Sequence, residues 1–143
     1  MNHMTHGLLY RVKRAARQIG EQHSHLGELL GALTPAIEQG RAGEARALFV
    51  RYRAAVGAHF ALEEAVFFPA LRGLHPDHTR DLELLGAEHA GFHDQIECLG
   101  ELLETDFNGS GDALRALIED LAVHESREER LVRELSADSP HPD

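Results

Sequence analysis

The chain has 143 residues and a formal net charge of -10, with a sequence pI of about 5.5. This length suits one compact domain, which we place at residues 1–143 with a core over about 8–136 and a flexible tail at 137–143. The single cysteine, Cys98, excludes an internal disulfide. The acidic charge argues against a nucleic-acid partner, because proteins that bind phosphate backbones carry basic surfaces. The sequence shows neither a signal peptide nor a membrane-spanning window, so we expect a cytoplasmic protein with no membrane partner.

Four long stretches have apolar residues at helical spacing, and strand-like alternation is nowhere sustained, so the predicted fold is all-α. Residues typical of turns interrupt the helices at 39–43, 73–77 and 105–111. Asp77 and Ser110 are predicted N-caps, and Pro35 and Pro69 are predicted to kink or end the first two helices. Loops this short favour an antiparallel up-down-up-down four-helix bundle.

Each predicted helix has an apolar seam that becomes polar near its middle. In the first helix the seam runs from Val12 to Leu33 and includes His23, which we expect to be buried, whereas His25 lies off it. The seam of the second helix has two members before its polar pair and two after it, and reads Tyr52, Val56, His59, Glu63, Val66 and Ala70.

The third and fourth helices repeat this pattern. The third seam runs from Leu82 to Leu103 through His89 and Phe92, with His93 on its edge. The fourth runs from Leu114 to Leu135 through His124 and Glu128. The segment 58–64 also resembles 123–129, and 21–23 resembles 87–89, so the second and fourth helices carry equivalent parts of one site, as do the first and third.

The polar residues are predicted to lie at one level of the bundle. His23 and His59 stand 18 residues before and after Arg41, the centre of the first loop. With the third loop centred at Asn108, His93 lies 15 residues before it and His124 16 after. At about 1.5 Å rise per residue, such offsets differ by less than one helical turn.

Histidine and carboxylate side chains in one buried layer predict a metal site, iron above all. A metal-free layer is less favourable, because each unpaired buried polar group costs about 1 to 3 kcal/mol. Seven ligands exceed one octahedral shell, which favours two ions. The predicted ligands, drawn from all four helices, are His23, His59, Glu63, His89, His93, His124 and Glu128.

The pattern resembles the hemerythrin-like, HHE cation-binding family over roughly residues 19–135. The motifs that carry the resemblance are residues 21–23, His59 and Glu63 before 67–69, His89 with His93, and His124 followed by 128–129. It implies a di-iron centre with an oxo or hydroxo bridge.

The resemblance also implies a role for each ligand. One iron would be held by His89, His93 and His124, and the other by His23 and His59, with Glu63 and Glu128 bridging. Dioxygen would bind the iron that has two histidines.

The second bridging position remains open between Glu128 and Glu129, and we prefer Glu128 because it stays on the seam. Apolar side chains are expected to line the ligand pocket: Leu26, Phe60, Phe92, Ile96 and Leu121. Tyr52, on the same seam as His59, is expected to be a core residue.

The leading functional prediction is a di-iron protein that binds dioxygen for carriage, storage or sensing, without catalytic residues. Two alternatives stay open: an enzyme that acts on peroxide or nitric oxide, and an iron-buffering or regulatory protein. Zinc or manganese could occupy the same ligands, and the sequence leaves the protein partner and oligomeric state open.

Overall fold

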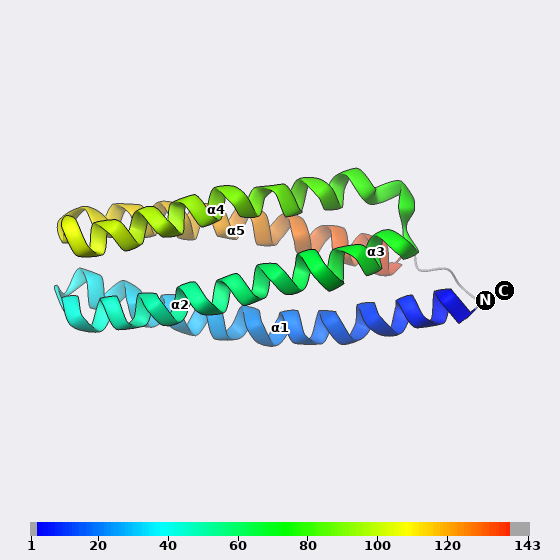
Figure 1. The fold of residues 1–143 in the computed structure, drawn as a ribbon, viewed down its shortest axis with the longest axis horizontal. Helices are drawn as coiled ribbons and strands as arrows, with labels where there is room; N and C mark the ends of the chain where they lie inside the picture. The colour runs from blue at the N-terminus through cyan, green and yellow to red at the C-terminus, as the bar shows by residue number, and fades with distance from the viewer. Residues whose placement is uncertain (1–2, 138–143) are drawn as a thin grey trace.

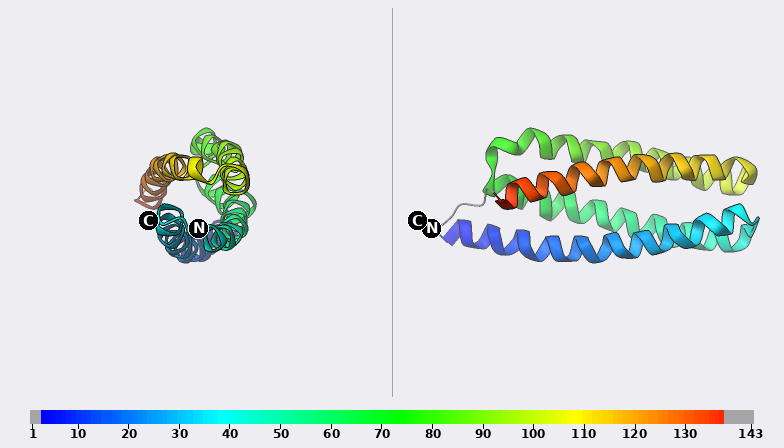
Figure 2. Two further views of the ribbon diagram at one scale, coloured as in Figure 1. Left: turned by 90° about the vertical axis from the view of Figure 1, so that its left-hand side faces the viewer. Right: turned by 180° about the vertical axis from the view of Figure 1, so that it is seen from behind.

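The computed structural model describes residues 3–137, and within this range the chain is helical and contains no strand. Four long helices, α1 (His3–Glu38), α2 (Ala42–Leu62), α4 (Thr79–Thr105) and α5 (Phe107–Ala137), form a bundle. In Figure 1 the chain reverses direction at each connection between them, and Figure 2 shows them end-on around a common axis. The predicted all-helical bundle is confirmed. Of the predicted tail, 137–143, only the final residue of α5 lies within the described residues.

The first connection is a tight turn built on a glycine. Gly40 has a φ of 71°, in the left-handed region that favours glycine. The amide of Arg41 donates to the carbonyl of Ala36 at 2.8 Å, and the amide of Gly40 donates to that of Ile37 at 3.1 Å. These two bonds form a Schellman motif, which satisfies the last carbonyls of α1. Helix α1 continues through Pro35 to its end at Glu38.

The third connection is much shorter than predicted, because only Asp106 separates α4 from α5. Ser110 is buried inside α5 and its hydroxyl donates to the carbonyl of Phe107 at 2.6 Å, so its predicted N-cap role is wrong. Asp77 lies within the short 3₁₀ helix η2 (Pro76–His78), and His78 precedes α4 without a side-chain cap. The predicted N-cap at Asp77 is therefore also wrong.

Helix α2 continues through a π-helical turn, η1 (Glu63–Phe67), into α3 (Phe68–Leu74). The amide of Phe68 donates to the carbonyl of Glu63, one residue further back than in an α-helix. This extra residue in the turn changes which side chains face the core. Val66, predicted to face inward, is 39% exposed, whereas Phe67 is 1% exposed. The prediction for Val66 is wrong because helical spacing alone does not anticipate the wide turn that precedes Pro69.

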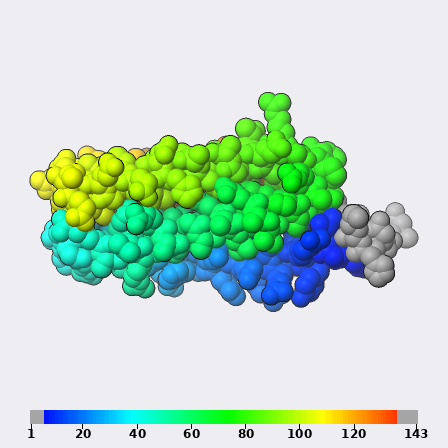
Figure 3. Space-filling view, viewed as in Figure 1, coloured from blue at the N-terminus to red at the C-terminus, as the bar shows by residue number. Residues whose placement is uncertain are grey.

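The core has two apolar clusters, one on each side of a polar layer. The larger cluster includes Leu33, Phe49 and Leu99, and the smaller, next to the ends of the chain, includes Phe67 and Leu71. Buried histidine and glutamate side chains lie between the two clusters. On the face viewed in Figure 3, side chains of α2 and α4 close over the interior.

The continuous helix Ala42–Leu74 is long and apolar enough to cross a membrane by length and composition alone, with a mean hydropathy of 1.3 in its most apolar window. The sequence prediction that no such window exists is therefore wrong. In the structure 44% of that window is buried, and the helix carries the buried residues His59 and Glu63. Core helices of soluble proteins pass the same test.

Candidate metal centre

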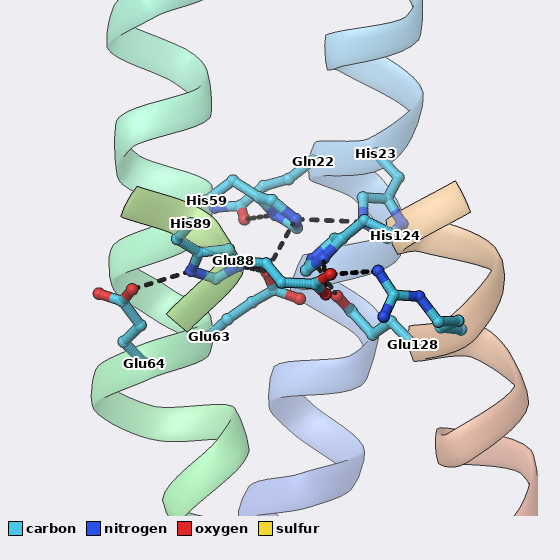
Figure 4. A network of polar contacts seen from close by, with 10 residues as sticks. Gln22, His23, His59, Glu63, Glu64, Glu88, His89, His124 and Glu128 are labelled. Carbon is cyan, nitrogen blue, oxygen red and sulfur yellow. Dashed lines mark hydrogen bonds and ion pairs between the residues drawn. The ribbon is translucent and has the colours of Figure 1, made fainter. Parts of the chain in front are cut away.

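Side chains from all four long helices meet in the polar layer, as Figure 4 shows. Five of the predicted ligands are buried, and they are His59, Glu63, His89, His124 and Glu128. His23, which was expected to be buried, is half-buried at the edge of the layer. His25 is exposed, in agreement with its position off the seam.

The ligand atoms form two groups that share one carboxylate. His23, His59 and Glu63 offer atoms within 4.8 Å of one another, and so do Glu63, His89 and His124. Oε1 of Glu63 lies 3.4 Å from Nε2 of His59 and 3.2 Å from Nε2 of His89. Nε2 of His23 lies 3.1 Å from Nε2 of His59. A carboxylate between two histidine groups has the position that a bridging ligand requires.

Glu128 completes the layer from α5. Its Oε2 lies 3.5 Å from Nε2 of His124, and its side chain is 2% exposed. Glu129, the alternative considered from the sequence, is exposed. The structure therefore brings Glu128, and not Glu129, into the layer beside Glu63.

Three of the histidines are oriented by a hydrogen-bond acceptor that contacts their outer nitrogen, Nδ1, the ring nitrogen that points away from the layer. Nδ1 of His59 lies 2.9 Å from Oε1 of Gln22, and Nδ1 of His89 lies 2.9 Å from Oε1 of Glu64. Amide and carboxylate oxygens only accept, so each Nδ1 carries the proton and donates it. The inward-facing Nε2 atoms then keep the lone pair that metal binding requires.

The third oriented histidine is His124, whose Nδ1 donates to Oε1 of Glu88 at 3.0 Å. Glu88 also pairs with Arg127 through its other oxygen. Gln22, Glu64 and Glu88 were not predicted from the sequence as orienting residues. The internal repeat contained a signal for two of them, because Gln22 and Glu88 each precede a seam histidine.

The protonation of the two buried carboxylates is coupled. Burial, and then the neighbouring carboxylate of Glu128, raise the pKa of Glu63. Burial also opposes the ionisation of Glu128, but His124, Glu63 and His23 together lower its pKa. Two such carboxylates side by side retain a shared proton unless a cation compensates their charge. A bound cation would replace that proton.

Burial favours the neutral form of the three buried histidines, but their neighbours shift the pKa values in different directions. Burial, and then His23, lower the pKa of His59 to about 4. Burial also lowers the pKa of His89, although Glu64 opposes the shift. Burial acts in the same direction on His124, but Glu128 and Glu88 outweigh it and raise the pKa. Neutral imidazoles are the form that binds metals.

The inward-facing atoms fit a metal because they are otherwise unsatisfied. Among the described residues, five buried atoms have no hydrogen-bond partner, and they are Oε1 and Oε2 of Glu63, Nε2 of His89, Nε2 of His124 and Oε2 of Glu128. Leaving one such group unpaired costs about 1 to 3 kcal/mol. Their convergence from separate helices indicates a cation site, because a cation would satisfy all five.

His93 does not join the layer. Its side chain is exposed, and its ring lies edge-on to Phe60 with centroids 5.4 Å apart. The sequence prediction placed His93 opposite His124 because it centred the third loop at Asn108. The connection is at Asp106, which His89 precedes by 17 residues and His124 follows by 18. His89 thus lies opposite His124, with ring centroids 5.3 Å apart.

A cavity of about 160 Å³ adjoins the layer on the side of His23 and His59. Leu26, Phe60 and Leu121 line it, as expected for a ligand pocket. All five predicted pocket residues are buried, but the lining of this cavity does not include Phe92 or Ile96. Phe92 instead lies edge-on to His124, at 5.1 Å between ring centroids.

Two polar residues also line this cavity. Tyr52, expected to be a core residue, is 1% exposed, and burial and then Glu125 raise the pKa of its hydroxyl. Burial also raises the pKa of Glu125, so its carboxyl group holds a proton more readily than an exposed one. Glu125 was missed from the sequence because it stands beside His124 and not on the seam.

The family of the chain follows from a comparison with family models. The model of the hemerythrin HHE cation-binding domain matches residues 14–135. The chain belongs to this hemerythrin family. The matched range contains all six ligands brought together in the layer, so the family's cation-binding description and the local geometry agree. No curated protein and no solved structure matches this hemerythrin-family chain.

Proposed function

We propose that this hemerythrin-like domain holds two iron ions in an antiparallel up-down-up-down four-helix bundle and binds dioxygen for carriage, storage or sensing. The observation that supports a two-metal site is the position of Glu63, whose carboxylate belongs to both ligand groups. One ion would have His23 and His59, the other His89 and His124. Glu63 and Glu128 would bridge the ions, with an oxo or hydroxo group between them.

Iron is the proposed metal because the ligand set combines imidazole nitrogens with carboxylate oxygens. No thiolate lies in the layer, and Cys98 is exposed, so the soft ligands that select copper(I) or iron–sulfur clusters are missing from it. When bound, a pair of ferrous ions supplies the electrons that dioxygen accepts on binding.

The protein's own contribution is orientation and exclusion of water. Gln22, Glu64 and Glu88 hold three imidazole rings with Nε2 inward. Leu26, Phe60 and Leu121 present apolar surface beside His59, where a small ligand would bind. Apolar walls limit the access of water and protons, which favours reversible binding over reduction of the ligand.

The second candidate is an enzyme that acts on peroxide or nitric oxide. Tyr52 and Glu125 favour it, because both line the cavity and both have a raised pKa. A phenol and a protonated carboxyl group beside the ligand position could supply protons to a substrate. Reversible binding of dioxygen by a carrier does not require such proton donors.

An optical spectrum of iron-reconstituted protein in air tests the proposal. An oxo-bridged pair and its oxygen adduct absorb differently from mononuclear iron. A stable adduct together with no consumption of added peroxide would support the dioxygen binder. Rapid catalytic loss of peroxide would support the enzyme, and iron bound only as mononuclear sites would exclude both.

A further inference from the structure

We propose that metal ions enter and leave through the opening between α1 and α5, and that the His23–His59 half of the site exchanges its ion first. This inference rests on the proposed two-metal site and adds to it a route and an order of exchange. It also assigns a positioning role to Glu129, which lines that opening.

His23 is the least restrained ligand of the layer. Figure 4 shows acceptors on the outer nitrogens of the other three histidines. Within the part of the chain that the structure describes, the one hydrogen bond of His23 runs to Nε2 of His59 at 3.1 Å, the nitrogen that would otherwise face a metal. His23 is also only half-buried, while His59, His89 and His124 are buried. An imidazole with no outer acceptor loses its ligand orientation most easily.

The internal repeat relates the two halves of the site, but one of the equivalent contacts is not formed between the described residues. Gln22 and Glu88 stand in equivalent places and orient His59 and His124. Glu64, which follows Glu63, orients His89 from η1. In the internal repeat, Glu129 corresponds to Glu64, and His23 corresponds to His89. In this structure Glu129 and His23 line a common cavity instead of forming that bond.

A cavity of about 390 Å³ lies where α1 faces α5. His23, Glu128 and Glu129 lie in its lining. Arg133 also lines it, so two carboxylates face one guanidinium and the local charge is attractive to a cation. His23 and Glu128 also line the cavity of about 160 Å³ that adjoins the ligand layer, so these two ligands border both cavities.

The two halves also differ in the charge of their outer acceptors. Carboxylates of Glu64 and Glu88 orient His89 and His124, and carboxylate acceptors make imidazole a better donor to the metal. The neutral amide of Gln22 orients His59. The His89–His124 half should therefore retain its ion longer. When a cation displaces the hydrogen bond between His23 and His59, we expect Glu129 to become the acceptor for Nδ1 of His23.

The test uses zinc, so that it does not depend on iron–oxygen chemistry. The full chain is loaded with two equivalents of zinc, and release to an excess of a colorimetric chelator is followed with time. Two phases of equal amplitude are expected. In His23→Ala the fast phase should disappear, with one zinc retained and released at the slow rate.

A matched pair of substitutions tests the opening. Glu129→Gln should accelerate the fast phase about 10-fold, because a neutral amide is a weaker acceptor for Nδ1 of His23 than a carboxylate, and leave the slow phase unchanged. Glu134→Gln removes the same charge from the same helix at an exposed position outside this cavity, and should change neither phase. Helical circular dichroism shows whether each variant is folded.

Two results would overturn the inference: release of both ions in one phase, or equal acceleration of both phases in Glu129→Gln. Neither result would affect the proposed dioxygen site if the iron-loaded protein still shows the spectrum of a bridged pair. Conversely, biphasic zinc release without such a spectrum would support the exchange route and exclude the proposed function.

Discussion

Oε1 of Glu63 lies 3.2 Å from Nε2 of His89, although the two residues come from helical segments on opposite sides of the η2 connection. Neither atom has a hydrogen-bond partner within residues 3–137. The same oxygen lies 3.4 Å from Nε2 of His59. A single carboxylate oxygen thus contacts a histidine of each ligand group, which makes Glu63 the residue on which the two-metal arrangement depends.

Replacement of Glu63 should therefore disrupt both halves of the site. We expect Glu63→Ala to bind less than one iron per chain, because both ions lose a shared carboxylate ligand, while His59→Ala should weaken mainly one ion. Metal analysis after reconstitution and gel filtration gives the stoichiometry. His25→Ala, an exposed histidine on the same bundle, is the control and should bind as much iron as the unchanged protein. Equal occupancy in all three variants would show that the ligands are assigned wrongly.

His93 provides a second comparison, because the resemblance implies that it is a ligand whereas its side chain is exposed here. We expect His93→Ala to retain wild-type iron content and His89→Ala to lose at least one ion. Both residues belong to α4, one helical turn apart, so helix propensity changes equally in the two variants. Loss of iron in His93→Ala would mean that α4 turns inward when metal binds.

The stability of metal-stripped protein should fall as the pH rises from about 6.5 to 9. The folded-state pKa of Glu63 is raised by burial and by Glu128 above its ordinary value of 4.5, so above that pH the folded state holds a proton that the unfolded chain releases. The raised pKa of His124 acts in the same direction. The pKa of His59, lowered from 6.5 to about 4, has the opposite effect on stability, but only between these two pH values.

Urea unfolding at several pH values measures this slope, which is at most about 1.4 kcal/mol per pH unit for one group. Glu63→Gln, which cannot ionise, should flatten it. A decline of the same steepness in Glu63→Gln would assign the effect to other groups. Saturation with metal should abolish the decline in the unchanged protein, because the cation replaces the shared proton.

Two glycines of α4 should respond in opposite directions to alanine. A Cβ on Gly100 would lie 2.8 Å from the ring of Phe49, which is buried, so Gly100→Ala forces α2 and α4 apart. A Cβ on Gly91 would meet no atom within 4 Å. We expect Gly100→Ala to lower the free energy of unfolding by about 1 to 3 kcal/mol, and Gly91→Ala to raise it by up to about 1 kcal/mol. Thermal unfolding of the two variants compares them; stabilisation by both would show that Phe49 moves freely.

Much of the bundle could be predicted from the sequence, because helical periodicity is a local property. The spacing of apolar residues places His59, Glu63, His124 and Glu128 on inward faces, and all four are buried. The internal repeat indicated that two halves of a site exist. Residues with no place in that periodicity, such as Gln22 and Glu64, were missed as partners of the ligands.

What the tertiary structure alone decided was register between helices and rotation within them. A connection of one residue at Asp106, in place of a longer loop, brings His89 and not His93 opposite His124. The π-turn after α2 buries Phe67 and exposes Val66. Both depend on how backbone hydrogen bonds and packing between distant segments compete, and that competition has no signature in residue spacing. The sequence therefore determined which residue types form the site, and the assembled bundle determined which of them meet.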